Sequence, residues 1–231
     1  MTASVLADWL ERIEQLHPAN IELGLDRIAC VHRQLDLPRP ATTIVSVAGT
    51  NGKGSVIRAL QALLEQAEAG ASAARVGVYT SPHLLRFNER ICIGGHAVDD
   101  ITLVAAFERV ERARQAAGSS ATGPVNLTYF EFTTLAAFCV FADAALDYAL
   151  LEVGLGGRLD AVNLVDADLA LITNIELDHE HWLGTTREAI AIEKAGILRR
   201  GAPCVIGDPN PPRSLLEAVQ AGAGVAYWAA G

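Results

Sequence analysis

The sequence predicts an α/β fold built around a mainly parallel sheet. Short apolar runs alternate with stretches of helical periodicity along most of the chain. The runs are compact and rich in Val, Ile and Leu, which is typical of strands that a parallel sheet buries on both faces. A glycine-rich turn joins the first run to the helix after it, where a phosphate-binding loop lies in such folds.

Composition limits the class of protein. The 231 residues, 51% of them hydrophobic, are enough for one large domain or two small ones, which excludes a disordered or collagen-like chain. The 27 acidic residues outnumber 18 basic ones, giving a formal net charge of −9, and no basic cluster is present. We therefore expect an enzyme acting on small molecules, with no nucleic-acid partner.

The secondary-structure elements are predicted in chain order from these patterns. An amphipathic helix, and not a signal peptide, is expected over 1–16. Strands are expected at 43–48, 76–79, 148–153, 169–173 and 203–206. Helices are expected at 55–66, from a cap at Asp99 or Asp100 to Gly118, at 132–141 and at 186–198. For the last helix, Thr185 and Glu188 form a capping-box pattern and Gly201 follows the end.

The regular alternation is expected to stop near Gly207, before a proline-rich stretch, a short helix and a glycine-rich tail. We therefore expect the single domain over 1–231 to be incomplete. Four scattered cysteines without metal or CxxC spacing indicate buried thiols in a reducing compartment. No apolar run reaches the roughly 20 residues that a bilayer requires, so we expect a cytoplasmic protein without a membrane partner.

The segment GTNGKGS is the strongest functional signal in the chain. Its candidate nucleotide-binding residues are Gly49, Thr50, Asn51, Gly52, Lys53, Gly54 and Ser55. The glycines let backbone N–H groups converge on phosphate oxygens, Lys53 adds a point charge, and Ser55 could reach Mg²⁺. The usual phosphate-loop pattern is not met, because Val47 stands where its first glycine belongs and Gly54 follows the lysine. An ordinary glycine-rich turn is the alternative.

Lysine is rare in this chain: Lys53 and Lys194 stand against 16 arginines. Arginine cannot replace a compact ammonium or a nitrogen that must lose its proton, so both lysines are candidate catalytic residues. In its predicted helix Lys194 lies four residues after Ile190 and three before Ile197, so its stem should face the apolar layer. Burial would lower its pKa and leave more free amine, which can add CO₂ to form a carbamate. A surface ion pair with Glu193 or with an aspartate is the alternative.

Seven further motifs follow the glycine-rich loop in order. They are TSPHL (80–84), RFNERI (86–91), LTYFEF (127–132), EVGLGGRLDA (152–161), DH (178–179), LGTT (183–186) and EKAGI (193–197). With the loop, they resemble the folylpolyglutamate synthase/dihydrofolate synthase family of the Mur ligase superfamily over roughly 23–207. The resemblance implies a parallel-sheet, P-loop NTPase-like domain of Mur ligase type.

The resemblance also implies a metal site. Ser81, Glu152 and His179 follow three different predicted strands, so a parallel sheet would bring them to one edge. In the similar ligases, residues at these places ligate Mg²⁺, and the lysine at the place of Lys194 is carbamylated and helps to hold a second Mg²⁺. His179 is therefore a candidate catalytic residue beside Lys53 and Lys194. By itself, His179 has the alternative of an ordinary surface or core histidine.

The substrate contacts implied by the resemblance lie in two segments. They are Thr128, Tyr129, Phe130 and Glu131 in the first, and Leu159, Asp160 and Ala161 in the second. Tyr129 and Phe130 offer flat surfaces for a pterin ring, although both could equally belong to the core. Arg86 and Arg90 could meet a phosphate or a carboxylate, or only solvent.

The resemblance implies an ATP- and Mg²⁺-dependent ligase that joins L-glutamate to dihydropteroate or a folate through an acyl phosphate. The sequence of the LTYFEF motif favours the bifunctional synthase. Family members continue into a C-terminal Rossmann-like domain, and this chain ends at Gly231, before it. We therefore expect no turnover from the chain alone, and a monomer by family default. Two alternatives stay open: another Mur-type amide ligase, or a non-catalytic nucleotide-binding module.

Overall fold

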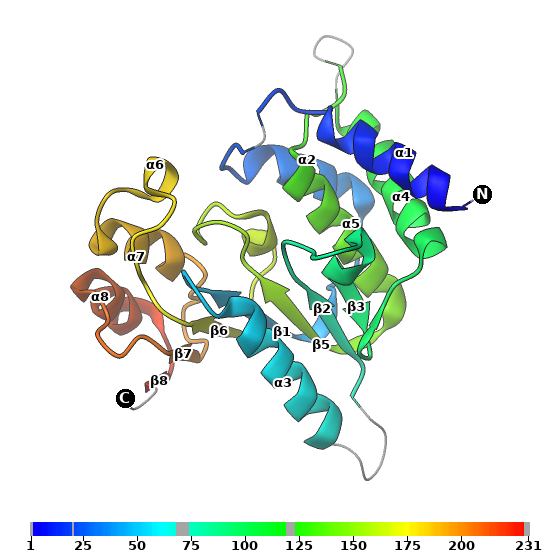
Figure 1. Ribbon diagram of the computed structural model, residues 1–231. Coiled ribbons are helices and arrows are strands. Elements are labelled where there is room, and N and C mark those ends of the chain that lie inside the picture. Colours follow the sequence, from blue (N-terminus) through cyan, green and yellow to red (C-terminus); the bar gives the residue numbers. More distant parts are fainter. Residues whose placement is uncertain (1, 20, 68–73, 119–122, 229–231) are drawn as a thin grey trace.

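The computed structural model describes residues 2–19, 21–67, 74–118 and 123–228, and a single sheet runs through it (Figure 1). The strand order within these ranges is β4-β3-β2-β5-β1-β6-β7-β8. The parallel strands are β2 (Val76–Tyr79), β5 (Leu146–Glu152), β1 (Ala41–Ala48), β6 (Leu169–Ile172), β7 (Cys204–Ile206) and β8 (Ala226–Trp228). In the described sheet, the antiparallel pairs are β2 with β3 (Ile91–Ile93) and β3 with β4 (His96–Ala97), so the sheet is mostly parallel, which confirms the predicted fold class.

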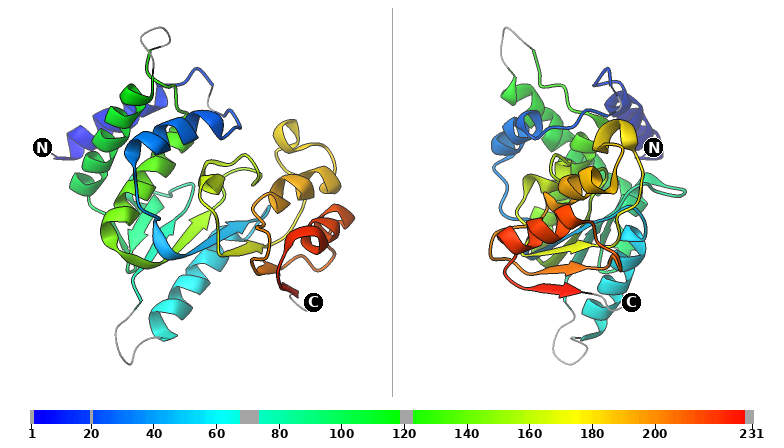
Figure 2. Two further views of the ribbon diagram at one scale, coloured as in Figure 1. Left: turned by 180° about the vertical axis from the view of Figure 1, so that it is seen from behind. Right: turned by 90° about the vertical axis from the view of Figure 1, so that its left-hand side faces the viewer.

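Helices cover both faces of the sheet (Figures 1 and 2). Helix α3 (Lys53–Ala67) covers one face, and its Ile57 shares a small core with Val45 and Val47 of β1. The helices α1 (Thr2–Glu14), α2 (Asp26–Leu35), α4 (Asp100–Ala117) and α5 (Tyr129–Ala144) cover the other face. There Ile44 and Ala48 belong to the larger core, as the two-residue alternation of a strand requires.

Helix α5 is buried, as its uniformly apolar sequence predicts, but it begins three residues earlier than expected. Thr128 Oγ1 accepts a hydrogen bond from Glu131 N at 3.3 Å, and Glu131 Oε2 accepts one from Thr128 N at 2.8 Å. This reciprocal capping box starts the helix at Tyr129. Thr128 and Glu131, predicted as substrate contacts, therefore also have a structural role.

Helix α7 (Arg187–Ala195) corrects two predictions. Its N-cap is Thr186, whose Oγ1 accepts from Ala189 N, while Glu188 accepts the N–H groups of Arg213 and Ser214 on the next helix, so the predicted Thr185–Glu188 box is wrong. The helix also ends before the predicted Leu198. Gly196 is its C-cap and lies so close to Arg158 that an added Cβ would be 2.3 Å from Arg158 Cβ.

The alternation of helices and strands does not stop near Gly207, as the sequence led us to expect. Helix α8 (Arg213–Gly222) and strand β8 add one more unit, with β8 parallel to β7. Residues 229–231 of the glycine-rich tail lie outside the described residues. Helix α2, strands β3 and β4, and the short helices η1 (Phe87–Arg90), η2 (Ala161–Leu164) and α6 (Glu180–Leu183) were not predicted individually.

The parallel strands end at one edge of the sheet. In register, Val47 of β1 lies beside Glu152 of β5, and Ala48 lies beside Ile172 of β6. The glycine-rich loop, Ser81, Glu152 and the segment before His179 therefore all leave the sheet at this edge. In the described ranges, no helix is long and apolar enough to span a membrane, and all four cysteines are free.

Candidate active site

The glycine-rich loop 49–55 leads from β1 into the N-terminus of α3, as predicted. Gly49 has φ +148°, and a Cβ there would lie 1.8 Å from Thr173 Oγ1, so only glycine is accommodated. Asn51, Gly52 and Ser55 are exposed at the start of the helix. Free N–H groups at a helix N-terminus favour an anion, so this loop can hold phosphate oxygens.

A segment after β6 holds this loop in shape. Thr50 N donates to Asn174 O at 2.9 Å, Asn51 N donates to Asn174 Oδ1 at 2.8 Å, and Thr173 Oγ1 donates to Asn51 O at 2.6 Å. Thr50 Oγ1 and the backbone of Glu176 add two further hydrogen bonds. Residues 173–176, which we call the loop clamp, therefore determine the loop geometry. No local sequence pattern indicated these residues.

The loop clamp is itself anchored from β7 and α7. Ile175 N donates to Asp208 Oδ2 at 2.8 Å, and Ile175 O accepts from Arg187 Nε at 2.6 Å. Arg187 Nη2 lies 3.0 Å from Asp208 Oδ2, and Asp208 is buried. Both backbone groups of Ile175 are thus satisfied by one ion pair.

Lys53 projects from the loop into a cavity. Its Nζ donates to Gly49 O at 3.0 Å and to Thr50 O at 3.4 Å. Glu152, at the end of β5, is 6% exposed, and its Oε2 accepts from Ser81 N at 3.1 Å. Burial raises the pKa of Glu152, against the hydrogen bond from Ser81 and the positive charge of Lys53.

These groups could hold a hard divalent cation. Glu152 is a buried carboxylate without an ion-pair partner among the described residues, which suits a cation beside the phosphate loop. In the same ranges, no three His, Cys, Asp or Glu side chains form a preformed metal cage. Mg²⁺ keeps several waters and takes phosphate oxygens as ligands.

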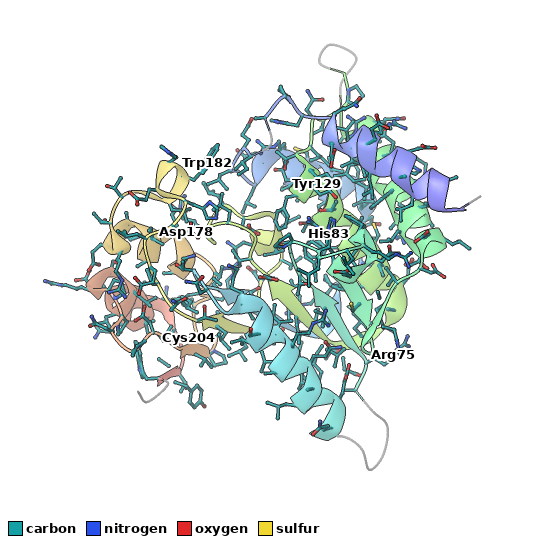
Figure 3. The ribbon with its side chains drawn as sticks, viewed as in Figure 1. Arg75, His83, Tyr129, Asp178, Trp182 and Cys204 are labelled. Atoms are coloured by element: carbon teal, nitrogen blue, oxygen red, sulfur yellow. The ribbon has the colours of Figure 1, made fainter. Side chains whose placement is uncertain are left out.

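His179 lines the same cavity as Thr50 and Lys53 of the loop. It has φ 49°, caps the short helix α6, and its Nε2 is 3.6 Å from Asp178 Oδ2. Half of its side chain is exposed. Figure 3 labels Asp178 on the loop after β6, and both Asp178 and His179 line the same cavity as Lys53.

Lys194 is buried, as the helical spacing predicts, with 5% of its surface exposed. The alternative of a surface pair with Glu193 is excluded, because Glu193 binds Arg158 at 2.9 Å. Burial lowers the pKa of Lys194 to about 8, and the charge of Lys53 acts in the same direction, against Asp178 and Asp160. Lys53, Lys194 and His179 line one narrow hollow of about 20 Å³, enough for about one water.

A larger cavity of about 460 Å³ brings most of the predicted site residues together. Its lining includes Thr50, Lys53, Ser81, Thr128, Tyr129, Phe130, Glu131, Leu159, Asp160, Ala161 and His179. Of the other predicted residues, Gly49 and Lys194 line the narrow hollow. Asn51, Gly52, Gly54, Ser55 and Glu152 line neither space.

One side of the cavity is apolar, and we call Tyr129, Phe130, Leu155 and Leu159 the aromatic wall. Phe130 stacks on Tyr79 of the core with ring centroids 5.9 Å apart, so the wall is both core and surface. Behind it, Arg27 Nε donates to Glu131 Oε2 at 2.9 Å. Glu131 Oε1 is, in the described ranges, the one buried side-chain nitrogen or oxygen without a hydrogen-bond partner.

Asp160 has a role that its motif did not reveal. It is buried, and its two oxygens accept from Leu155 N at 2.8 Å and Val162 N at 3.0 Å. Burial raises the pKa of Asp160 to about 7, against these hydrogen bonds. Its carboxyl therefore shapes the turn that carries Leu155 and Leu159 while it lines the cavity.

Comparison with known proteins agrees with this geometry. The model of the Mur ligase middle domain matches residues 47–207. The chain belongs to the Mur ligase middle domain family. The dihydrofolate synthase/folylpolyglutamate synthase of Escherichia coli K12 is 45% identical over 218 residues, covering 94% of this chain and 49% of that protein. The resemblance found in the sequence is thereby confirmed.

Solved structures extend the likeness of this Mur ligase family member. E. coli FolC in complex with DHPP and ADP has a TM-score of 0.89 at 43% identity, covering 99% of this chain and 52% of that one. Mycobacterium tuberculosis folylpolyglutamate synthase complexed with ADP and AMPPCP has a TM-score of 0.83 at 33% identity, covering 100% and 50%. The chain spans about half the length of the curated relatives it matches.

Proposed function

We propose that this chain carries the nucleotide site and the acceptor site of an ATP-dependent ligase. The enzyme joins L-glutamate to dihydropteroate, to folates, or to both, as a bifunctional dihydrofolate synthase/folylpolyglutamate synthase. One observation carries the proposal: a single cavity is lined both by Lys53 of the phosphate loop and by the aromatic wall. A flat, partly polar ring suits that wall, and the free acceptor at Glu131 Oε1 suits an N–H group of such a ring.

The reaction requires two anions to be aligned and neutralised. A carboxylate of the acceptor attacks the γ-phosphorus of ATP, which gives an acyl phosphate and ADP. The amino group of L-glutamate then attacks the acyl carbon, forming the amide and releasing phosphate. In the proposal, loop 49–55 binds the ATP phosphates, while Lys53 compensates their charge and keeps them in line with the acceptor.

Two Mg²⁺ ions complete the proposed site, and when bound they neutralise charge on the transferring phosphoryl group. We assign Ser81, Glu152 and His179 as ligands of one ion. Ser55 would contact an ion from the side of the phosphate loop. We assign a carbamate of Lys194 to the second. The buried, uncompensated Glu152 and the lowered pKa of Lys194 support this assignment.

The carbamate has a test of its own. In ¹³C-bicarbonate, the chain should show a carbamate carbonyl signal, and electron density at Lys194 should extend beyond Nζ. Lys194→Arg, which keeps the charge but cannot form the carbamate at neutral pH, is the control. Absence of both the signal and the density would remove Lys194 from the proposed metal ligands.

The domain assignment is also a proposal. Residues 1–231 would form the ATP-binding part, and glutamate capture would need the part of the relatives that this chain does not cover. The chain alone would then show no ligase turnover, and robust amide formation by it would contradict this. We further propose a cytoplasmic monomer without a nucleic-acid partner, because its charge is acidic and its cysteines are free.

Calorimetric titration tests the proposed function. The chain is titrated first with ATP·Mg²⁺ and then, in its presence, with dihydropteroate. Binding of both ligands is expected. Nucleotide binding without dihydropteroate binding would favour another Mur-type ligase or a nucleotide-binding module, and binding of neither would reject the proposal for this chain.

A further inference from the structure

One cation at the cavity is still without an assigned partner. Arg90, at the end of η1, is 9% exposed and lines the cavity together with Lys53 and Ser81. Arg86, four residues earlier in the same motif, is a surface residue with 71% of its side chain exposed, 3.4 Å from Asp100. The two arginines that the sequence could not separate therefore lie in different environments.

The guanidinium of Arg90 is held in one orientation by three neighbours. Its Nε donates to His83 Nδ1 at 2.9 Å. Its Cζ lies 5.6 Å from the ring centre of Phe87 and 5.4 Å from that of Tyr129. Figure 3 labels His83 and Tyr129, and Arg90 contacts both. Such cation–π contacts orient a guanidinium but do not use its terminal N–H groups.

Those terminal N–H groups have no acceptor within the described part of the chain. Only Nε of Arg90 forms a hydrogen bond there, and no carboxylate lies within 4.0 Å of Arg90. Neither Nη atom is among the buried atoms without a partner, so both remain accessible although only 9% of Arg90 is exposed. A guanidinium with so little exposed surface has lost part of its hydration without gaining a counter-ion. An anionic ligand in the cavity would supply that counter-ion.

Among the described residues, the carboxylates that line the cavity do not pair with Arg90. Asp160 accepts from backbone N–H groups through both oxygens, and Glu131 Oε2 accepts from Arg27. The ligand phosphates belong at the loop, where the helix N-terminus and Lys53 lie. Arg90 instead stacks on Tyr129, at the edge of the aromatic wall.

We propose that Arg90 binds the carboxylate of the acceptor through its Nη atoms. This inference rests on the proposed function and extends it. An acceptor whose ring lies on the aromatic wall would present its carboxylate at the edge where Arg90 is fixed. The planar fork of arginine matches a carboxylate in two-point contact, which would orient it for attack on phosphorus. The carboxylate is the benzoate of dihydropteroate or a glutamate carboxylate of a folate, and the experiment separates the two.

The experiment measures binding to the 231-residue chain by calorimetry. The variants are Arg90→Gln, Arg90→Lys and, as the matched control on the same loop, Arg86→Gln. The probes are ATP·Mg²⁺, and then, with the nucleotide bound, dihydropteroate, folate and 6-hydroxymethylpterin. The last has the pterin ring but no carboxylate, so it reports on the aromatic wall alone.

Arg90→Gln should lower the affinity for dihydropteroate or folate by about 10- to 100-fold, as expected for the loss of charged hydrogen bonds. Its affinity for 6-hydroxymethylpterin and ATP should stay unchanged, which also shows that the variant is folded. The affinity of Arg90→Lys should lie between those of the wild type and Arg90→Gln, because lysine keeps the charge but lacks the planar pair of N–H donors. A loss of affinity for folate alone would show that Arg90 binds a glutamate carboxylate. A loss of affinity for dihydropteroate would show that it binds the benzoate.

Four outcomes would overturn the inference. If Arg90→Gln lost the same affinity for 6-hydroxymethylpterin, Arg90 would only stabilise the aromatic wall. If it lost affinity for ATP alone, Arg90 would be a phosphate ligand. Unchanged affinities in Arg90→Gln would remove it from binding altogether, while leaving the proposed function intact. A wild-type chain that binds ATP but no pterin probe would reject the proposed function, and this inference with it.

Discussion

The two sides of the cavity are built by different means. On the side that we propose binds phosphate, every hydrogen bond between loop 49–55 and the loop clamp uses at least one backbone group, and glycine gives the loop its path. On the side that we propose binds the acceptor, buried charges shape the surface: Glu131 with Arg27, Asp160 with backbone N–H groups, and Arg90 against two rings. Backbone geometry suits a ligand group that never varies, such as phosphate, whereas side chains can change with the acceptor.

The largest effect that tests this contrast is expected for Gly49→Ala. The new Cβ would lie 1.8 Å from Thr173 Oγ1 at φ +148°, so the loop must move away from its clamp. ATP affinity should fall by at least about 100-fold in calorimetric titration, which equals about 2.7 kcal/mol.

The control is Gly201→Ala, at φ +78° with nothing within 4 Å of the new Cβ. It should cost about 1 kcal/mol of stability and leave ATP binding unchanged. If Gly49→Ala binds ATP like the wild type, backbone geometry does not determine the phosphate side.

The next effect concerns the anchor behind the loop clamp. Asp208→Ala removes the acceptor of Ile175 N and the partner of Arg187. The free energy of unfolding should fall by about 3 kcal/mol in urea titration, since one charge of a largely buried pair loses its partner. Arg213→Ala breaks an exposed pair with Glu217 and should change stability by less than about 0.5 kcal/mol. Equal effects of the two variants would show that the anchor is unimportant.

The smallest effect is a pH dependence from Lys194, which lies between the two sides. Its pKa is about 8 in the folded chain against an ordinary value of 10.5, so the unfolded chain binds more protons between these values. Stability should therefore rise with pH from about 8 to 10.5, by on the order of 2 kcal/mol from this residue.

Lys194→Met should lack that rise when unfolding is followed by urea titration in metal-free, CO₂-free buffer. Below pH 8 the variant should be the more stable protein, because no charge is buried. Parallel pH profiles for the wild type and the variant would contradict the burial argument.

The two sides also differ in how far the sequence predicts them. The strands, α3 and the phosphate loop follow from local patterns, and residues 49–55 lie where the pattern requires. The loop clamp was missed because Asn174 binds residues more than 120 positions away, and no local spacing indicates such a pair. Asn174 does follow a strand end at the ligand edge, which is the one signal that could have suggested it.

On the acceptor side the sequence identified the residues but not what they do. Thr128 and Glu131 were expected as ligand contacts, and they also cap a helix, which the spacing Thr-x-x-Glu could have revealed. Arg86 and Arg90 were indistinguishable in the motif, because burial depends on the rings that the fold brings beside Arg90. The end of α7 was misplaced because Gly196 contacts Arg158, which is distant in sequence.

Asp208 has a practical consequence for where the chain can be cut. The family match ends at Gly207, so a shortened protein designed on that boundary would lack the carboxylate that holds Ile175. Such a protein would keep the glycine-rich loop and the seven motifs that follow it, and would still lack this anchor of the loop clamp. The smallest piece worth expressing therefore extends through α8, whose first residues also hold Glu188.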